Sequence, residues 1–128
     1  MAALTALDTH VVVWLHAGRV DLLPEELHVQ LDREPAVISP MVLLELEYLR
    51  EIDRIAVGAD EIFADLSAEI GLSLCTQPFA AVIRESLKQT WTRDPFDRVI
   101  VAQSIVAGDA LATKDDSVLQ HCPTAFWQ

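Results

Sequence analysis

The chain is 128 residues long, 52% hydrophobic and strongly acidic, with a formal net charge of −11. This length fits one domain with one core over residues 1–128, and the acidic balance excludes a broad basic face for duplex nucleic acid while favouring a positively charged partner. A membrane or secretory chain is not indicated either, because no apolar run reaches the roughly 20 residues that span a bilayer and the amino terminus lacks a basic region. We therefore expect a cytoplasmic protein whose two cysteines, Cys75 and Cys122, are reduced and inert.

Short apolar runs alternate with longer helical patterns along the first half of the chain. Prolines in first turns and a serine N-cap mark the starts of two of these helices. In chain order, the predicted elements are a strand over residues 3–7, a helix over 9–17, a helix starting at Pro24, a strand over 36–39, and a helix starting at Ser39 and Pro40.

The second half continues the alternation, and a glycine stops each of its two longest helical patterns. In chain order, its predicted elements are a helix over 59–70 ended by Gly71, a strand over 72–75, a helix over 78–90, a helix from Asp94 and Pro95 to Gly108, a strand over 111–113, a helix over 116–121, and an edge strand over 125–127. Strands that alternate with helices predict an α/β fold, with a mostly parallel central sheet of four to five strands and helices on both faces.

Four acidic residues stand where a solvated charge is not expected. Asp8 and Asp115 each follow a predicted strand, Glu45 interrupts an apolar helix face, and Asp97 opens an apolar helix. Isolated carboxylates rarely tolerate such places unless they are paired or bound to metal. Because functional groups gather at the carboxyl ends of parallel strands, we expect these acids to share one pocket for a hard divalent cation, Mg²⁺ or Mn²⁺.

Helix phase separates the unusual carboxylates from the ordinary ones. At about 100° per residue, Glu47 points to solvent, whereas Glu45 falls on the apolar side of its helix with Met41, Val42, Tyr48, Leu49 and Ile52. The same test places Asp97 on a largely buried stripe of its own helix.

Each acid also has a purely structural explanation. Asp8 and Asp94 stand where they would cap the helices that follow, and Asp97 would favour the positive end of a helix dipole. Asp115 or its neighbour Asp116 would cap the last helix, so the fourth member of the pocket is either of the two. Four such coincidences are less probable than one acidic pocket, and we favour the pocket.

Four segments of the chain together resemble the PIN-domain family, and within it the VapC-type ribonuclease toxins of prokaryotic toxin–antitoxin pairs. The most specific segment is Asp94-Pro95-Phe96-Asp97-Arg98, which leads into an apolar helix. The other segments are Leu7-Asp8-Thr9-His10, Ile38-Ser39 with Glu45-Leu46, and Leu111-Ala112-Thr113-Lys114-Asp115. The chain departs from many relatives at Leu44, where they carry Trp, and at Asp116, a second acid beside the fourth position.

The resemblance implies a PIN-like three-layer sandwich that acts as a metal-dependent endoribonuclease. Metal-activated water would cleave single-stranded or looped RNA, with Mg²⁺ or Mn²⁺ as cofactor. The family's catalytic and metal-binding quartet falls on Asp8, Glu45, Asp97 and Asp115, with support from Thr9, Asp94 and Thr113. The resemblance also implies a homodimer and a cognate antitoxin, which would lay an amphipathic segment in a groove and offer an arginine to the acids.

Substrate binding needs positive charge near the acids. Arg93, Arg98 and Lys114 are adjacent to the acids in sequence and are the RNA-binding candidates, with ordinary ion pairs or helix ends as the alternative. His10 in the first predicted helix is expected to have a packing or surface role, and Trp14 either packs there or forms a partner surface.

Two other functions compete with the nuclease. A receiver-like phosphotransfer domain also combines an α/β fold with an Mg²⁺ pocket, but it needs a second acid beside Asp8 and a phosphate-accepting aspartate after a middle strand, which ends here at Ser39. A non-catalytic PIN-like domain would only bind a partner, and the presence of all four acids disfavours it.

Overall fold

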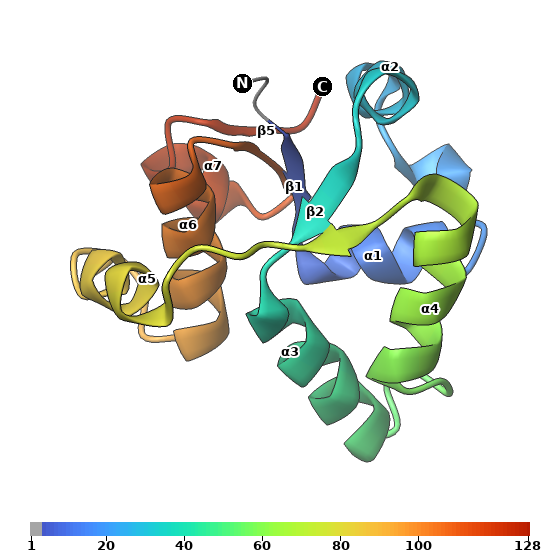
Figure 1. The fold of residues 1–128 in the computed structure, drawn as a ribbon, viewed down its shortest axis with the longest axis horizontal. Coiled ribbons are helices and arrows are strands. Elements are labelled where there is room, and N and C mark those ends of the chain that lie inside the picture. Colours follow the sequence, from blue (N-terminus) through green and yellow to red (C-terminus); the bar gives the residue numbers. More distant parts are fainter. Residues whose placement is uncertain (1–3) are drawn as a thin grey trace.

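A five-stranded parallel sheet forms the centre of the protein in this computed structural model, which describes residues 4–128 (Figure 1). The strands are β1 Thr5–Leu7, β2 Ala36–Ile38, β3 Ser73–Leu74, β4 Ala110–Ala112 and β5 Ala125–Phe126. They lie in the order β3-β2-β1-β4-β5, and every neighbouring pair is parallel. The predicted parallel α/β architecture is therefore confirmed. The predicted start of β1 at residue 3 lies outside the described residues.

Helices cover both faces of the sheet, as predicted. They are α1 Thr9–His16, α2 Glu25–Arg33, α3 Pro40–Glu51, α4 Ala59–Ile70, α5 Phe79–Ser86, α6 Pro95–Ala107 and α7 Asp116–His121. In Figure 1, α5, α6 and α7 lie on one side of the strands, α1, α2 and α4 lie on the other, and α3 extends below. Two details near α2 were not predicted: a short 3-10 helix over Val20–Leu22, and Pro24 as the N-cap instead of a residue of the first turn.

The strand order reverses direction beside β1. From β1 the chain moves outward to β2 and β3 on one side, and it then returns to add β4 and β5 on the other side. In open parallel sheets, ligands bind outside the carboxyl ends of the strands at such a reversal. The junction of β1 and β4 is therefore the place where this fold offers a site. The order also differs from the 2-1-3-4-5 order of flavodoxin-like domains, the class that includes receivers, so the receiver hypothesis is wrong.

Short-range interactions set the start of α4. The Glu47 carboxylate of α3 accepts a 3.1 Å hydrogen bond from the backbone N–H of Ala59 and pairs with Arg50. A Cβ on Gly58 would lie 3.1 Å from the same carboxylate, so glycine gives the chain room to turn here. Glu47, predicted to face solvent, thus also fastens α3 to α4.

The predicted extent of α5 is wrong. The helix ends at Ser86 and not at residue 90. The Gln89 side chain is buried, donates a 3.2 Å hydrogen bond to Glu85 and accepts a 2.8 Å hydrogen bond from the Trp91 indole. These contacts bend the chain into a turn, which helix propensity alone does not predict. The other boundaries differ from the prediction by a residue or two.

The core fills both spaces between the sheet and its helices. Strand residues Leu7, Ile38 and Leu111 are fully buried, and so are Leu46 of α3 and Val101 of α6. These side chains pack in one continuous cluster, which holds the strand ends in register. Among the described residues, no helix has both the length and the apolar character needed to cross a membrane.

Replacement of Leu111 by alanine tests this core. Leu111 is fully buried in β4, and the loss of a buried leucine lowers the free energy of unfolding by about 2–5 kcal/mol. Val20→Ala is the control, because Val20 is 52% exposed and its truncation should change stability by less than about 0.5 kcal/mol. Urea denaturation followed by circular dichroism measures both, and equal effects would contradict this account of the core.

Candidate active site

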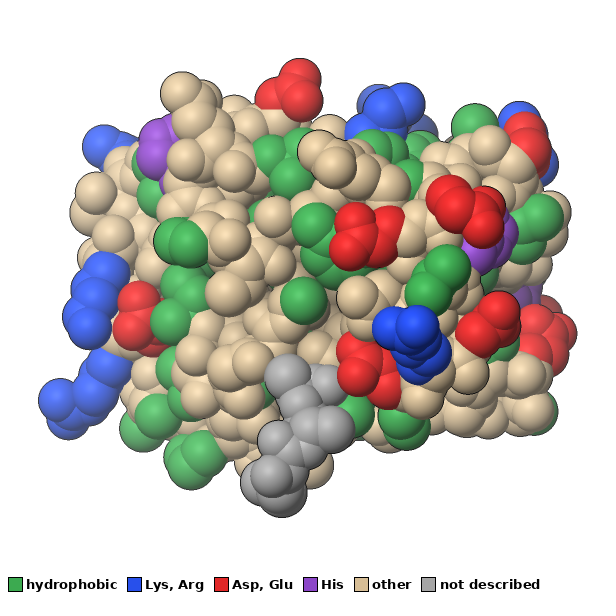
Figure 2. Space-filling view, turned by 90° about the horizontal axis from the view of Figure 1, so that it is seen from above, with side chains coloured by type: hydrophobic (Ala, Val, Ile, Leu, Met, Phe, Trp, Pro, Cys, Tyr) green, Lys and Arg blue, Asp and Glu red, His purple; other side chains and the backbone are tan. Residues whose placement is uncertain are grey.

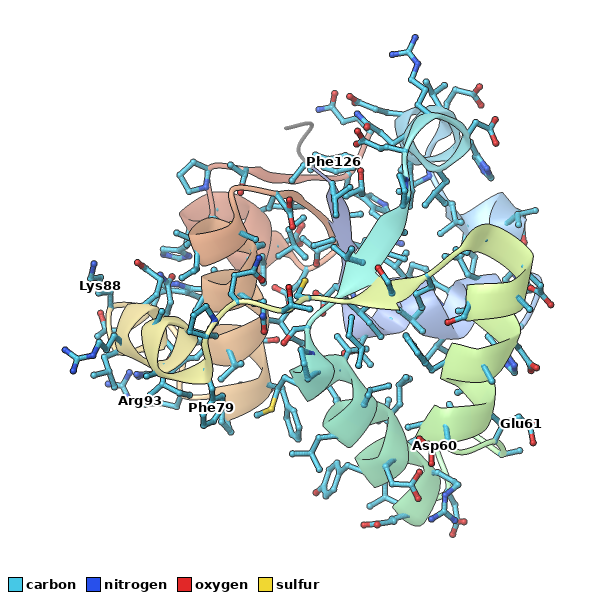
Figure 3. All side chains as sticks on the ribbon, in the orientation of Figure 1. Asp60, Glu61, Phe79, Lys88, Arg93 and Phe126 are labelled. Atoms are coloured by element: carbon cyan, nitrogen blue, oxygen red, sulfur yellow. The ribbon has the colours of Figure 1, made fainter. Side chains whose placement is uncertain are left out.

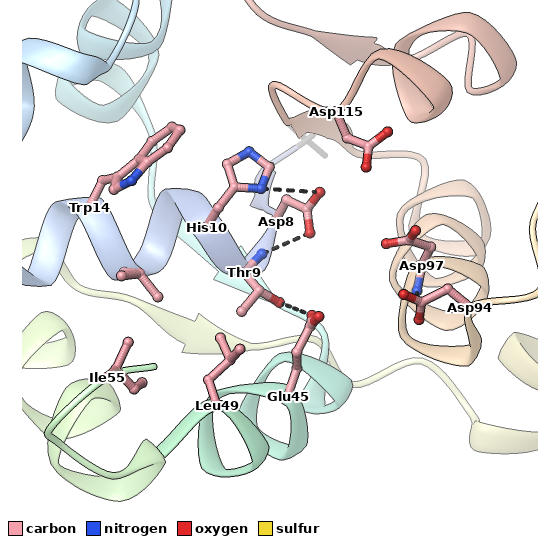
Figure 4. A pocket seen from close by; sticks show the side chains of 11 residues that line it. Asp8, Thr9, His10, Trp14, Glu45, Leu49, Ile55, Asp94, Asp97 and Asp115 are labelled. Atoms are coloured by element: carbon pink, nitrogen blue, oxygen red, sulfur yellow. Dashed lines mark hydrogen bonds and ion pairs between the residues drawn. The ribbon is translucent and has the colours of Figure 1, made fainter. Parts of the chain in front are cut away.

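A pocket of about 340 Å³ opens at the carboxyl edge of β1 and β4 (Figure 4). All four acids singled out in the sequence line it, and Asp94 is a fifth. The lining residues are Asp8, Thr9, His10, Val13, Trp14, Glu45, Leu49, Ile55, Asp94, Asp97 and Asp115. The fold therefore brings together carboxylates that are separated by more than a hundred positions in the chain.

Asp8 is held at the centre of the junction between β1 and β4. Its backbone N–H donates to the carbonyl of Ala112 at 3.0 Å, which extends the pairing of the two strands. One carboxylate oxygen accepts from the Thr9 backbone N–H at 2.8 Å, and the other accepts from the Thr113 hydroxyl at 2.7 Å. Both oxygens of this buried carboxylate are thereby oriented before any ligand arrives.

Thr9 connects Asp8 to Glu45. Its backbone N–H donates to Asp8, while its hydroxyl donates to the Glu45 carboxylate (Figure 4). Glu45 is half-buried, and burial raises the pKa of its carboxyl, with a further increase from Asp8 and Asp94; the hydrogen bond from Thr9 acts in the opposite direction. Glu45 is thus as unfavourably placed as helix phase indicated, and Val42 beside it is buried, but the prediction is wrong for Tyr48 and Ile52, which are about half exposed at the end of α3.

Three of the acids are helix N-caps. Asp8 caps α1 through its bond from Thr9. Asp94 caps α6 and accepts from the backbone N–H groups of Phe96 at 2.8 Å and Asp97 at 3.4 Å. Asp115 caps α7, whereas Asp116 is exposed and does not line the pocket. The structural and the functional explanations of these acids are therefore compatible.

Asp97 carries the largest electrostatic strain of the pocket. Burial raises the pKa of its carboxyl to about 7, with additional contributions from the nearby charges of Asp94, Asp8, Asp115 and Glu45. Without a bound cation, the pocket disfavours the ionised form of Asp97. A bound cation would relieve this repulsion.

The donor set suits a hard divalent cation, because carboxylate oxygens are the ligands that Mg²⁺ and Mn²⁺ prefer. The pocket is not a closed cage, however. Within residues 4–128, no three acidic, histidine or cysteine side chains lie close enough to enclose an ion as they stand. Mg²⁺ usually keeps several of its waters and binds few carboxylates directly, so an open acidic pocket meets its requirements.

The three predicted RNA-binding cations, Arg93, Arg98 and Lys114, are not part of the pocket lining. The guanidinium groups of Arg93 and Arg98 each donate, at 2.9 Å, to a backbone carbonyl of the segment that precedes α6. Lys114 is exposed, and its ammonium lies 6.0 Å from the centre of the Trp14 ring. Among the described residues that line the pocket, none is lysine or arginine.

The sequence analysis did not assign His10 and Trp14 to the site. Both line the pocket, on the side opposite Asp97 in Figure 4. One signal was available: the two residues are four positions apart and therefore share a face of α1, directly after Asp8.

Fold and pocket together define a small α/β domain with a carboxylate-rich site at the switch point of a parallel sheet. The sequence model of the PIN-domain family matches residues 5–122, and the chain therefore belongs to that family. The family resemblance seen in the sequence is thus confirmed. No curated protein matches the chain by sequence.

Three solved structures of VapBC complexes contain a chain of similar fold. In the DNA-bound VapBC2 of Rickettsia felis, the TM-score is 0.65 at 15% identity, over 98% of this chain and 97% of that chain. In the DNA-bound VapBC of Salmonella typhimurium, it is 0.62 at 14% identity, over 97% and 96%. In VapBC-1 of nontypeable Haemophilus influenzae, it is 0.56 at 16% identity, over 98% and 96%. At these identities the likeness shows the fold.

Asp97→Asn should stabilise the metal-free protein in a pH-dependent manner. The raised pKa means that the stability contributed by Asp97 is present below pH 4 and is lost as the pH rises to about 7. The gain from asparagine should therefore grow across this range and level off above it, at about 1 kcal/mol after allowance for solvent screening of a half-exposed group. Urea denaturation in EDTA at several pH values measures it.

Asp116→Asn is the matched control for this series. It removes one negative charge from an exposed position just outside the pocket, so its effect on stability should be small at every pH. A gain in the free energy of unfolding of Asp97→Asn that is the same at pH 4 and pH 8 would contradict the raised pKa of Asp97.

Proposed function

We propose that this chain is a metal-dependent endoribonuclease, the VapC-type toxin of a type II toxin–antitoxin pair. The observation that carries the proposal is the gathering of five carboxylates at the switch point of a PIN-domain fold. Buried like charges are costly unless a ligand compensates them, and a divalent cation does so. The similar chains in VapBC complexes support the toxin assignment.

In this proposal, Asp8, Glu45, Asp97 and Asp115 hold Mg²⁺ or Mn²⁺ and are the catalytic residues. A bound cation of this kind polarises a phosphodiester and lowers the pKa of a water molecule. Thr113 orients Asp8 through its hydroxyl, and Thr9 orients both Asp8 and Glu45. Asp94 fixes the first turn of α6 and so sets the position of Asp97.

The substrate in this proposal is single-stranded or looped RNA. Arg93, Arg98 and Lys114 would contact its phosphates from the rim of the pocket, where each is close in sequence to an acid. Lys88 and Arg93 extend to the same side of the molecule in Figure 3, and Figure 2, a view of the face away from the pocket, shows lysine and arginine side chains along the same left edge and at separate points elsewhere. This limited basic edge suits one flexible strand better than a rigid duplex.

Cleavage of a mixed single-stranded RNA tests the activity. The wild-type protein should cut with Mg²⁺ or Mn²⁺ and not with EDTA. Asp97→Asn and Glu45→Gln should each lower the rate by more than about 100-fold, since even indirect changes at metal sites lower activity 10- to 100-fold. Asp116→Asn should cut like the wild type, because Asp116 lies outside the pocket.

Calorimetric titration with Mn²⁺ separates the enzyme from a non-catalytic PIN-like domain. The enzyme should bind Mn²⁺, and Asp97→Asn should weaken that binding. A chain that neither binds Mn²⁺ nor cuts RNA would be a partner-binding domain, and the proposed activity would then be wrong.

A cognate antitoxin is the proposed protein partner. A trough of about 260 Å³ between α1 and α4 is lined by apolar side chains that include Val13, Ile55, Val57 and Ile62. Val13 and Ile55 also line the acidic pocket, so the trough and the pocket adjoin each other. An amphipathic antitoxin segment in the trough would reach the acids with an arginine, and the net charge of −11 favours such a basic partner.

A homodimer is proposed through the outer face of α3, α5 and α6. A groove of about 470 Å³ there is lined by residues that include Met41, Leu44, Phe79, Val82 and Val99, and 77% of the surface of Phe79 is exposed. None of the described residues that line this groove is charged. Two chains of net charge −11 repel each other, so an uncharged groove with an exposed phenylalanine suits a symmetric contact between copies.

Phe79→Glu should shift the protein from dimer to monomer, because it places one buried charge in each half of the contact. Light scattering coupled to gel filtration measures the molar mass. Val20→Glu is the matched control, because Val20 is exposed and lies outside this groove. Equal masses for both variants would argue against this face.

A further inference from the structure

The acidic pocket has a second wall that cation binding does not explain. This wall consists of Val13, Trp14, Leu49 and Ile55, which are apolar, and of His10, whose Nδ1 atom lies 3.8 Å from the Asp8 carboxylate (Figure 4). A hydrated divalent cation gains nothing from an indole or an isoleucine side chain, because its ligands are oxygen atoms. The wall therefore suits an apolar part of the substrate, while the cation held by the acids would bind the phosphate of that substrate.

Three rings build this wall without stacking flat on one another. The His10 and Trp14 rings lie 5.0 Å apart at 61°, and Trp127 leans on both of them, at 6.1 Å and 68° from His10 and at 5.9 Å and 54° from Trp14. His10 is fixed further by a 2.9 Å hydrogen bond that its Nε2 atom accepts from the backbone N–H of Lys114. These inclined contacts hold the Trp14 ring at the pocket without a face-to-face stack on another aromatic ring, and the Lys114 ammonium lies over it.

The chain contains a contrasting pair. Trp91 and His121 stack in parallel, with ring centres 4.9 Å apart and only 2° between their planes. Neither residue lines the acidic pocket. The pair away from the acids is thus closed face to face, whereas the pair beside them is held edge to face.

Charge at the rim identifies the ligand class. The Lys114 ammonium lies 6.0 Å from the centre of the Trp14 ring, so a cation and an aromatic face stand together at the mouth of the pocket. An unpaired nucleotide combines a π-face with a phosphate, and any of the bases can stack on an aromatic side chain.

We propose that His10, Trp14 and Lys114 form a nucleotide subsite in which one unpaired base stacks on Trp14, while the adjoining phosphate contacts Lys114. This inference rests on the proposed ribonuclease function. It specifies that the strand must present an unstacked base beside the phosphate that is cut. Trp127 acts as the support behind the two rings.

Binding of RNA without cleavage tests the subsite. Fluorescence anisotropy in EDTA measures the affinity of the full chain for a labelled single-stranded RNA and for the same strand with abasic nucleotides. Trp14→Leu should weaken binding of the intact RNA by at least about 5-fold and leave binding of the abasic strand unchanged. Trp14→Tyr should retain the affinity, and Trp91→Leu, at the closed pair, should bind like the wild type.

Lys114→Ala should lower the affinity for both strands and reduce the slope of log affinity against log salt by about 0.7, the effect of one lost phosphate contact on a single strand. Circular dichroism checks that each variant is folded, and Trp14→Met, with the same expected loss, replaces Trp14→Leu if that variant does not fold. Cleavage with Mg²⁺ is read on the same wild-type samples.

Failure of the subsite differs from failure of the nuclease. If the wild type cuts and binds RNA while Trp14→Leu binds as tightly as Trp91→Leu, the subsite is wrong, and the aromatic wall belongs to a protein partner. If the wild type neither binds nor cuts RNA, the proposed function is wrong and the subsite is wrong with it. Loss of affinity in Trp14→Leu that the abasic strand does not show would establish the stacked base.

Discussion

The pairing of β1 with β4 is the constraint on which the rest of the site depends. These strands are distant in sequence, yet the Asp8 backbone N–H bonds to Ala112, and the Asp8 carboxylate receives the Thr113 hydroxyl. Because the strand order reverses at this junction, helices that follow different strands begin around the same point. A shift of one residue in this register would turn Asp8 to the other face and separate it from Thr113. The pocket therefore depends on the register of β1 and β4 as much as on the acidic residues themselves.

Helix starts then make the concentration of negative charge tolerable. Asp8, Asp94 and Asp115 each accept backbone N–H groups at the beginning of a helix, where the helix dipole favours a negative charge. Glu45 and Asp97 cap no helix, and burial raises the pKa values of both carboxyl groups. The pocket therefore contains three acids that accept hydrogen bonds from the backbone N–H groups of a helix start, and two that do not.

Much of this arrangement can be predicted from the sequence, because it depends on interactions between residues that are close together in the chain. Strand runs, N-caps and glycine stops predict the order of elements, and helix phase distinguishes Glu45 from Glu47. The early end of α5 was not predictable, because it depends on a buried contact between Gln89 and Trp91. The placement of Trp14 was equally hidden, since helix periodicity gives its face but not which neighbour that face meets. The double role of Glu47, solvated and yet bonded to Ala59, required the three-dimensional turn at Gly58.

The capping roles of three acids bear on how other chains of this fold are compared. A descendant that had lost its chemistry would still need a polar residue at the positions of Asp8, Asp94 and Asp115 to begin α1, α6 and α7. Their retention in a relative is consequently evidence of folding and says little about activity. Glu45 and Asp97 cap no helix, and only a ligand repays the free energy of placing them among like charges. Active and inactive relatives should therefore differ at the positions of Glu45 and Asp97.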